Sequence, residues 1–159
     1  MKKNKLLVLL FYCSIVLLLV GCAKREIKNI DSKGKNIVCF GDSITFGYGA
    51  EPGGDYPSAL TKMTSVAVIN AGIDGDTSTE ALKRLKSDVL DREPLLVIVE
   101  FAGNDFLRKI PQEVTLNNVR EIIDKIQAQG AMVAVVDIST AMILKQYHSA
   151  FYNLAREKG

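Results

Sequence analysis

Four short apolar runs recur along the chain, separated by segments in which apolar residues return at helical spacing. Each run has the length of a strand and shows no regular alternation of apolar and polar residues. This pattern is typical of strands that are buried on both faces of a parallel sheet. The runs lie at residues 36–41, 66–70, 95–101 and 131–136.

Four further segments are predicted helices, at residues 56–63, 77–89, 116–126 and 147–158. A Thr-x-x-Glu capping box that begins at Thr77 marks the start of the second helix. Gly130 stands just past the end of the third helix, where glycine is common. In the last helix we expect Phe151, Leu154 and Ala155 to face inward.

Strands that alternate with helices and are joined by right-handed crossovers form a parallel sheet with helices on both faces. The predicted fold class is therefore α/β, with a doubly wound parallel sheet in a three-layer α/β/α sandwich. A chain of 159 residues is enough for one domain. We expect this domain to span residues 36–159.

A different apolar segment, at residues 6–20, follows the basic start at residues 1–5. It is short for a membrane span, whereas a basic start and an apolar segment of this length describe a secretory signal. The ending Leu19-Val20-Gly21-Cys22 resembles the bacterial lipobox, in which the cysteine becomes the lipidated first residue. We therefore predict a lipoprotein signal peptide at residues 1–21 and lipidation of Cys22. The alternative is a signal anchor that stays uncut.

The positive charge of the chain belongs mostly to this signal. The formal net charge is +2, and the loss of Lys2, Lys3 and Lys5 with the signal leaves −1. The composition therefore does not indicate nucleic-acid binding. Residues 22–35 are polar and charged after the cysteine, and we expect them to tether the domain to the lipid.

The cysteines and the histidine limit the possible metal and redox chemistry. Cys13 lies in the signal and Cys22 at the lipid site, so Cys39 has no partner for a disulfide. Cys39 is interpreted as a small buried hydrophobic residue. With His148 as the only histidine, the sequence predicts no zinc site, and no metal or organic cofactor is implied.

Polar residues directly follow three of the predicted strands. Asp42 and Ser43 follow the first strand, Gly75 comes after the second and Asn104 after the third. Because the carboxyl ends of parallel strands share one edge of a sheet, we expect these residues to converge. Alternatively, the first loop is an ordinary strand-to-helix turn in which Asp42 or Ser43 only caps the helix.

The three loops contain the groups that acyl transfer through serine requires. A serine hydroxyl is a weak nucleophile until a base removes its proton, and the tetrahedral intermediate carries an oxyanion that needs hydrogen-bond donors. Ser43 could attack a carbonyl carbon, while its own backbone N–H, that of Gly75 and the Asn104 amide could donate to the oxyanion. Glycine at position 75 would also let the carbonyl approach closely.

At these positions the chain resembles a known family. Residues 41–45 (Gly-Asp-Ser-Ile-Thr), 70–77 (Asn-Ala-Gly-Ile-Asp-Gly-Asp-Thr) and 103–105 (Gly-Asn-Asp) are similar to the first three blocks of the SGNH hydrolases, also called GDSL-type esterases. The stretch 99–105 is most similar to the branch of acyl-CoA thioesterase I, lysophospholipase L1 and arylesterase. The resemblance covers roughly residues 36–159.

The resemblance implies a flavodoxin-like SGNH fold, with Ser43 as the nucleophile and Gly75 and Asn104 as oxyanion donors. The chain has no Gly-x-Ser-x-Gly elbow, which disfavours an ordinary α/β-hydrolase. The family's base is a histidine in an Asp-x-x-His motif after a fifth strand, and this sequence contains neither. We therefore expect the domain to be truncated before its last strand. His148 lacks the motif because Lys145 stands three residues before it, so it is interpreted as a surface histidine.

Four acidic residues stand near the proposed site. Asp42 and Asp105 are expected to brace their loops by accepting hydrogen bonds from backbone amides. Asp137 is interpreted as a polar strand terminus, although it could face the cleft. Glu100 lies within the third strand, where it could be buried and paired, and no role is assigned to it.

The favoured hypothesis is a lipid-anchored serine ester hydrolase of the bacterial cell envelope, incomplete or inactive as given. Lysophospholipids, short acyl or aryl esters and acetylated envelope glycans are candidate substrates, whereas an extracytoplasmic location disfavours acyl-CoA. Two alternatives remain: a non-catalytic envelope lipoprotein that binds acyl or acetylated glycan ligands, and a decayed gene product with an exposed sheet edge.

Overall fold

Four parallel strands form one sheet in the order β2-β1-β3-β4. The computed structural model describes residues 27–138 and 145–159, so the predicted signal peptide and Cys22 lie outside the described residues. Because β2 lies on one side of β1 and β3 on the other, the winding reverses at β1, where sheets of this kind form a ligand crevice. The strands are β1 (Asn36–Gly41), β2 (Ala67–Gly72), β3 (Pro94–Glu100) and β4 (Met132–Val135).

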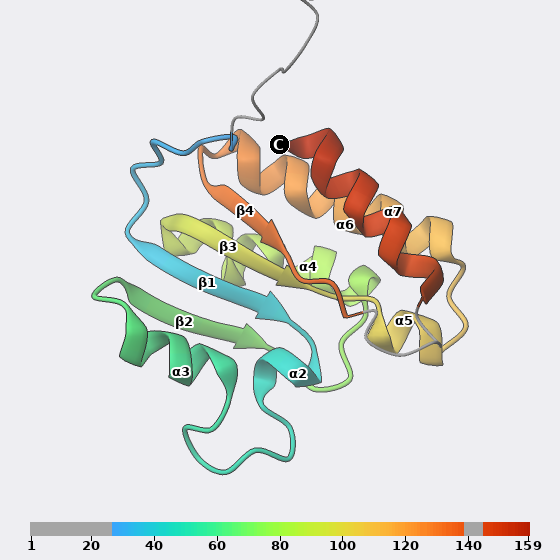
Figure 1. Cartoon of the computed structure of the whole chain (residues 1–159), viewed down its shortest axis with the longest axis horizontal. Coiled ribbons are helices and arrows are strands. Elements are labelled where there is room, and N and C mark those ends of the chain that lie inside the picture. The colour runs from blue at the N-terminus through green and yellow to red at the C-terminus, as the bar shows by residue number, and fades with distance from the viewer. Residues whose placement is uncertain (1–26, 139–144) are drawn as a thin grey trace, which may run out of the picture.

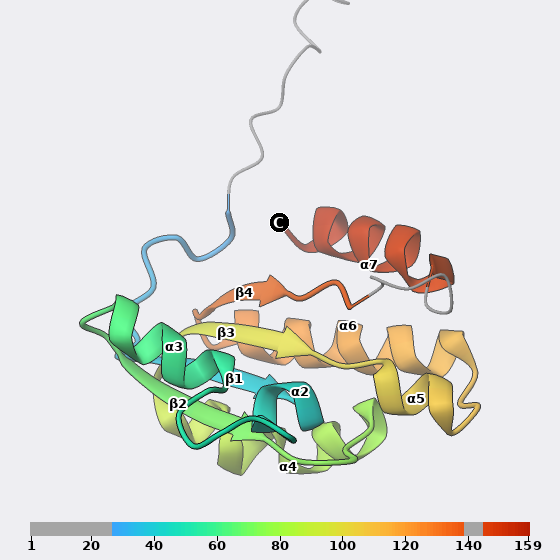
Figure 2. The same cartoon turned by 60° about the horizontal axis from the view of Figure 1, so that its bottom comes forward.

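Helices cover both faces of this sheet (Figures 1 and 2). On one face α4 (Ser78–Asp88) packs beside α6 (Gln112–Ala128), whereas α3 (Tyr56–Met63) lies on the other face. α7 (Lys145–Lys158) contacts α6 and the edge strand β4. The remaining elements are short: α2 (Ser43–Phe46) after β1, the 3₁₀ helix η1 (Leu90–Arg92) before β3, and α5 (Gly103–Leu107) after β3.

The predicted fold class is confirmed, since a parallel sheet lies between helices. The capping box is also present, because Glu80 Oε2 accepts from the Thr77 N–H at 2.9 Å. The short helices α2 and α5 were not predicted, because four or five residues are too few for a helical apolar pattern. One inward-facing residue was predicted wrongly: Ala155 is exposed. α7 instead turns Tyr147, Phe151 and Leu154 to the core, at spacings of four and three residues.

The hydrophobic core holds β1 rigidly in the middle of the sheet. Val38 and Phe40 of β1 are fully buried, and the Phe40 ring packs edge-on against Phe101, with ring centroids 5.0 Å apart. Burial of a side chain of this size stabilises the fold by about 1.5 to 3 kcal/mol. The turn at Asp42 and Ser43 therefore starts at the end of a strand that is held by β2 on one side and by β3 on the other.

The described part of the predicted tether lies against the domain. Asn29 Nδ2 donates hydrogen bonds to the carbonyl oxygens of Gln127 and Ala131, both at 2.9 Å. These contacts attach the chain at the carboxyl end of α6 before β1 begins. Across residues 27–138 and 145–159, no helix combines the length and the apolar character that a membrane span requires.

Candidate active site

Ser43 is the first residue of α2 and lies at the carboxyl end of β1. Asp42 caps this helix by accepting a hydrogen bond from the Ile44 N–H at 3.0 Å. The half-buried Ser43 hydroxyl donates to Asp42 Oδ1 over 3.5 Å, which is long and therefore weak. Among the described residues no other side chain hydrogen-bonds to this hydroxyl. It is therefore free to meet a substrate.

Gly41 allows the turn to pack tightly on β3. A Cβ at this position would lie 2.0 Å from Thr45 Oγ1 and 2.7 Å from Glu100 Oε2. No side chain fits in that space without moving the turn. The glycine is therefore required by the packing beneath Ser43.

Gly75 lies in the loop after β2 and adopts a φ of +75°, in the left-handed region that favours glycine. Its carbonyl oxygen accepts a hydrogen bond from Arg108 Nη2 at 2.7 Å. Its N–H makes no hydrogen bond to the described residues, and the same holds for the Ser43 N–H at the start of α2. Both donors are thus available to an acceptor that enters the site.

Asn104 joins the three loops. Its Nδ2 donates to the carbonyl oxygen of Asp76 at 2.9 Å and to Asp42 Oδ2 at 3.2 Å. Asp76 follows Gly75, and Asp42 precedes Ser43. The structure therefore brings the three predicted positions to one edge of the sheet, as the sequence analysis expected.

Asp42 and Asp105 brace the loops as predicted. Asp42 accepts from the Ile44 N–H, and burial raises the pKa of its carboxyl group. Asp105 is fully buried and accepts from the Ser78 N–H at 2.9 Å and from Thr115 Oγ1 at 3.0 Å. Asp105 thereby ties the loop of Asn104 to helices α4 and α6.

Arg84 of α4 is a clamp that sequence reasoning missed. Its Nη1 and Nη2 donate to the carbonyl oxygens of Ala71 and Gly41, at 2.8 and 3.1 Å, at the ends of β2 and β1. Its Nε and Nη2 also approach Asp76 Oδ2 at 2.7 and 2.6 Å. The available signal was the position of Arg84, which stands three residues after Ala81 and one before Leu85, both on the buried side of an amphipathic helix.

Replacing Arg84 with methionine is expected to lower the free energy of unfolding by about 3 kcal/mol, because a buried carboxylate loses its cationic partner. Asp76 is only 7% exposed, and two strand-end carbonyl oxygens lose a donor as well. Urea unfolding measures the change. Lys86→Met is the matched control, since the Lys86–Asp91 pair is exposed and such pairs contribute about 0 to 1 kcal/mol. Equal losses in both variants would contradict the clamp.

Two other groups under the turn are buried. Glu100, at the end of β3, accepts from the Asp42 N–H at 3.3 Å and from Thr45 Oγ1 at 3.0 Å. Cys39 is also fully buried, as predicted, and burial raises the pKa of its thiol to about 11. The thiol therefore stays protonated and unreactive at neutral pH.

His148 lies on the surface of α7, in keeping with its interpretation as a surface histidine, and is 60% exposed. Its Nδ1 contacts Asp137 Oδ2, in the segment that follows β4. Sequence reasoning considered both residues but did not pair them. No hydrogen bond joins the imidazole to Ser43 in the part of the chain that the structure describes.

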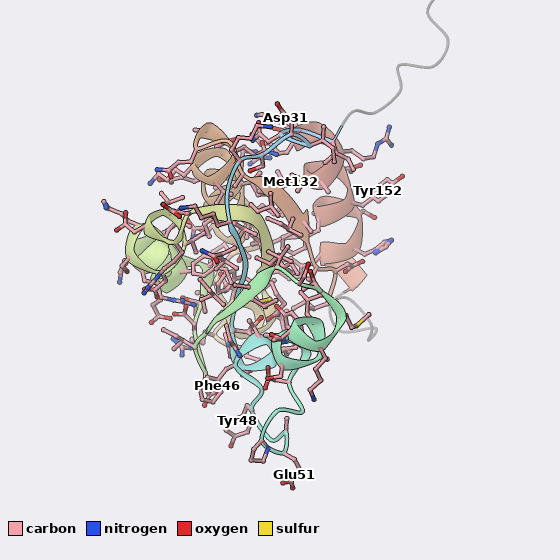
Figure 3. All side chains as sticks on the ribbon, turned by 90° about the vertical axis from the view of Figure 1, so that its left-hand side faces the viewer. Asp31, Phe46, Tyr48, Glu51, Met132 and Tyr152 are labelled. Carbon is pink, nitrogen blue, oxygen red and sulfur yellow. The ribbon has the colours of Figure 1, made fainter. Side chains whose placement is uncertain are left out.

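Large apolar side chains are exposed around the carboxyl edge of the sheet. Ile44 and Phe46 follow Ser43 on α2, and Tyr48 comes just after this helix. Ile73, in the loop after β2, and Leu107, the last residue of α5, are exposed as well. Figure 3 shows Phe46 and Tyr48 at the end of the molecule opposite Asp31. Within the described ranges, no cluster of His, Cys, Asp and Glu is arranged to hold a metal ion.

Comparison with known proteins identifies relatives of this chain. Residues 39–158 match the GDSL-like Lipase/Acylhydrolase family. The chain is 31% identical over 127 residues to esterase TesA of Pseudomonas aeruginosa, which covers 77% of this chain and 63% of that protein. It is also 31% identical over 118 residues to thioesterase 1/protease 1/lysophospholipase L1 of Escherichia coli K12, which covers 72% of this chain and 57% of that protein. The chain thus spans less than two thirds of the length of both relatives.

A solved structure and a shorter sequence match add to this result. AlinE4, an esterase of the SGNH-hydrolase family, is similar with a TM-score of 0.67 at 29% identity, over 79% of this chain and 73% of that chain. The uncharacterized lipoprotein YqeF of Bacillus subtilis is 34% identical over 79 residues, which covers 45% of this chain and 32% of that protein.

Proposed function

Because this chain belongs to the GDSL-like lipase/acylhydrolase family, we propose that it is a serine ester hydrolase that acts through an acyl-enzyme on Ser43. One observation carries the proposal. Asn104 Nδ2 hydrogen-bonds to the residue before Ser43 and to the residue after Gly75, so a nucleophile and three donors meet at one edge. This is the set of groups that acyl transfer through serine needs.

In the proposed reaction, Ser43 Oγ attacks the carbonyl carbon of an ester or thioester and gives its proton to a base. The oxyanion accepts hydrogen bonds from the backbone N–H groups of Ser43 and Gly75 and from Asn104 Nδ2. The alcohol or thiol leaves with the proton, and water then releases the acid and regenerates Ser43. Both N–H groups support this role because they lack acceptors among the described residues. The two hydrogens of Asn104 Nδ2 are already donated, so the oxyanion has to replace Asp42 Oδ2, which accepts the longer of the two bonds.

The base of this reaction is an imidazole, by resemblance to the family. The described contacts of Ser43 include no imidazole, and His148 contacts Asp137 instead. We therefore assign the nucleophile and the oxyanion donors to residues of this chain and assign the base to none of its described residues. Covalent labelling of Ser43 decides whether the chain itself also activates the serine.

The proposed substrates are small esters or thioesters with an apolar acyl or aryl group. The exposed side chains of Ile44 and Phe46, which follow Ser43 on α2, offer apolar contacts to such a group. The names of the relatives, an esterase and a thioesterase and lysophospholipase, fit the same class. Short acyl esters, aryl esters, lysophospholipids and acetylated glycans form the test panel.

Hydrolysis of this panel tests the function directly. We expect at least one ester to be cleaved faster than in buffer, with stoichiometric release of acid and alcohol. If the folded protein cleaves none of them, the enzymatic proposal fails.

We further propose that the protein is held at the cell envelope by a lipid on Cys22. The lipobox-like ending at residues 19–22 and the similarity to a lipoprotein of Bacillus subtilis support this location. Expression with an alkyne-labelled fatty acid is expected to label the wild type and not Cys22→Ser. Cys39→Ser is the matched control and should keep the label, because Cys39 is buried in β1. Equal labelling of wild type and Cys22→Ser would contradict the anchor.

A further inference from the structure

Glu100 is a carboxyl group that the proposed reaction does not use. It is fully buried at the carboxyl end of β3, where it pairs in register with Gly41 of β1. Gly41 leaves the space that the carboxyl group occupies, since a Cβ there would lie 2.7 Å from Glu100 Oε2. The chain therefore contains a site built for this side chain directly under the nucleophile turn.

Glu100 accepts hydrogen bonds from residues that lie before and after Ser43 in the chain. Glu100 Oε2 accepts from the Asp42 N–H at 3.3 Å and from Thr45 Oγ1 at 3.0 Å. Asp42 precedes Ser43, and Thr45 lies two residues after it. The Thr45 hydroxyl lies 3.0 Å from Tyr56 Oη, which links the same network to the start of α3.

The charges around Glu100 favour its neutral form. Burial and the carboxylate of Asp42 raise the pKa of Glu100 to about 8, and no cationic side chain pairs with it among the described residues. The ionisable groups that face this network are Asp42 of the turn, Tyr56 of α3, Cys39 of β1 beside Tyr56 and, beyond Asp42, Asp105 of α5. Ionised Glu100 would meet a like charge at Asp42 with no cation to offset it.

We propose that Glu100 is a positioning residue for the nucleophile: its carboxyl group fixes the Asp42–Thr45 turn and thereby the direction of Ser43 Oγ. This inference rests on the proposed function, because it assumes that Ser43 reacts. A misplacement of about 1 Å in a reacting group is enough to cost about 10²-fold in rate. A buried group that holds both ends of the turn therefore affects the chemistry without touching the substrate.

Two variants of nearly the same volume separate positioning from packing. Glu100→Gln keeps an oxygen that accepts from Asp42 and Thr45, and its amide replaces the neutral acid. Glu100→Met fills the space and accepts neither hydrogen bond well. We expect the rate constant for labelling by a fluorophosphonate at neutral pH to stay within about threefold in Glu100→Gln and to fall at least about tenfold in Glu100→Met.

The pH dependence gives a second readout. The pKa of Glu100 is raised from 4.5 to about 8 in the folded protein. In the pH window between these two values, the folded state therefore keeps a proton that the unfolded state has lost. Stability of the wild type relative to Glu100→Gln is therefore expected to fall as pH rises through this window. The ratio of wild-type to Glu100→Gln labelling rates should likewise fall as pH rises above about 8.

The experiment is run on the full chain from about pH 6 to about pH 9.5, with thermal unfolding of each variant alongside. Equal labelling of the Met and Gln variants, or a wild-type to Gln ratio that does not change with pH, would overturn the inference. If the wild type is not labelled at all, the proposed function fails separately. The ¹H–¹⁵N shift of Ser43 then decides: it should move further with pH in the wild type than in Glu100→Gln, where Asp42 still titrates beside it, and equal movement in both would overturn the positioning role.

Discussion

Replacing Ser43 with alanine is expected to abolish hydrolysis of any ester that the wild type cleaves. The other hydroxyl at this end of β1, that of Thr45, is fully buried and donates to Glu100, so Ser43 is the hydroxyl that a substrate can reach beside the two free N–H donors. Loss of the nucleophile of a serine hydrolase lowers turnover by about 10⁶. Initial rates at saturating ester measure the loss.

Ser87→Ala is the matched control for this variant. Ser87 lies exposed on α4, and within the described part of the chain its hydroxyl bonds only to neighbouring residues of that helix. We expect its turnover to stay at the wild-type level. A Ser43→Ala protein that keeps more than about one hundredth of the wild-type rate would place the chemistry elsewhere.

Replacing Asn104 with alanine is expected to lower kcat by about 10² to 10³, which is the usual cost of losing one oxyanion donor. The effect should appear in kcat more than in KM, because the oxyanion exists only in the transition state and the intermediate. Asn104 Nδ2 is the donor that already touches the other two loops. Steady-state kinetics with one good ester separates the two constants.

Asn117→Ala is the control, because Asn117 lies on the exposed side of α6 and bonds only to Arg120 in the described contacts. It removes an amide of the same size that makes no described contact with Ser43, Gly75 or Asn104. Thermal unfolding of both variants checks that the loss in Asn104→Ala is not a loss of fold. Equal kcat values for Asn104→Ala and wild type would remove Asn104 from the reaction.

The parts of the site that follow strands could be predicted from the sequence. A parallel sheet brings every strand-to-helix loop to one edge, so Ser43, Gly75 and Asn104 had to meet once β1, β2 and β3 were recognised. The bracing roles of Asp42 and Asp105 followed from their short side chains beside turn amides, and the structure confirms them.

The parts that depend on side-chain packing could not be predicted. Helical periodicity places Arg84 beside the apolar face of α4 but does not indicate that its long side chain reaches Gly41 and Asp76. The bond from Thr45 to Glu100 joins residues 55 positions apart and depends on how closely β1 approaches β3. No spacing rule within one segment indicates such contacts.

The most direct test of the central claim is covalent labelling of Ser43 by a fluorophosphonate, followed by intact mass and peptide mapping. We expect one adduct per chain, located on Ser43 and absent from Ser43→Ala, because only an activated hydroxyl reacts stoichiometrically. A folded protein that takes up no label would contradict the account. It would instead indicate an envelope lipoprotein that binds acyl or acetylated glycan ligands without hydrolysing them.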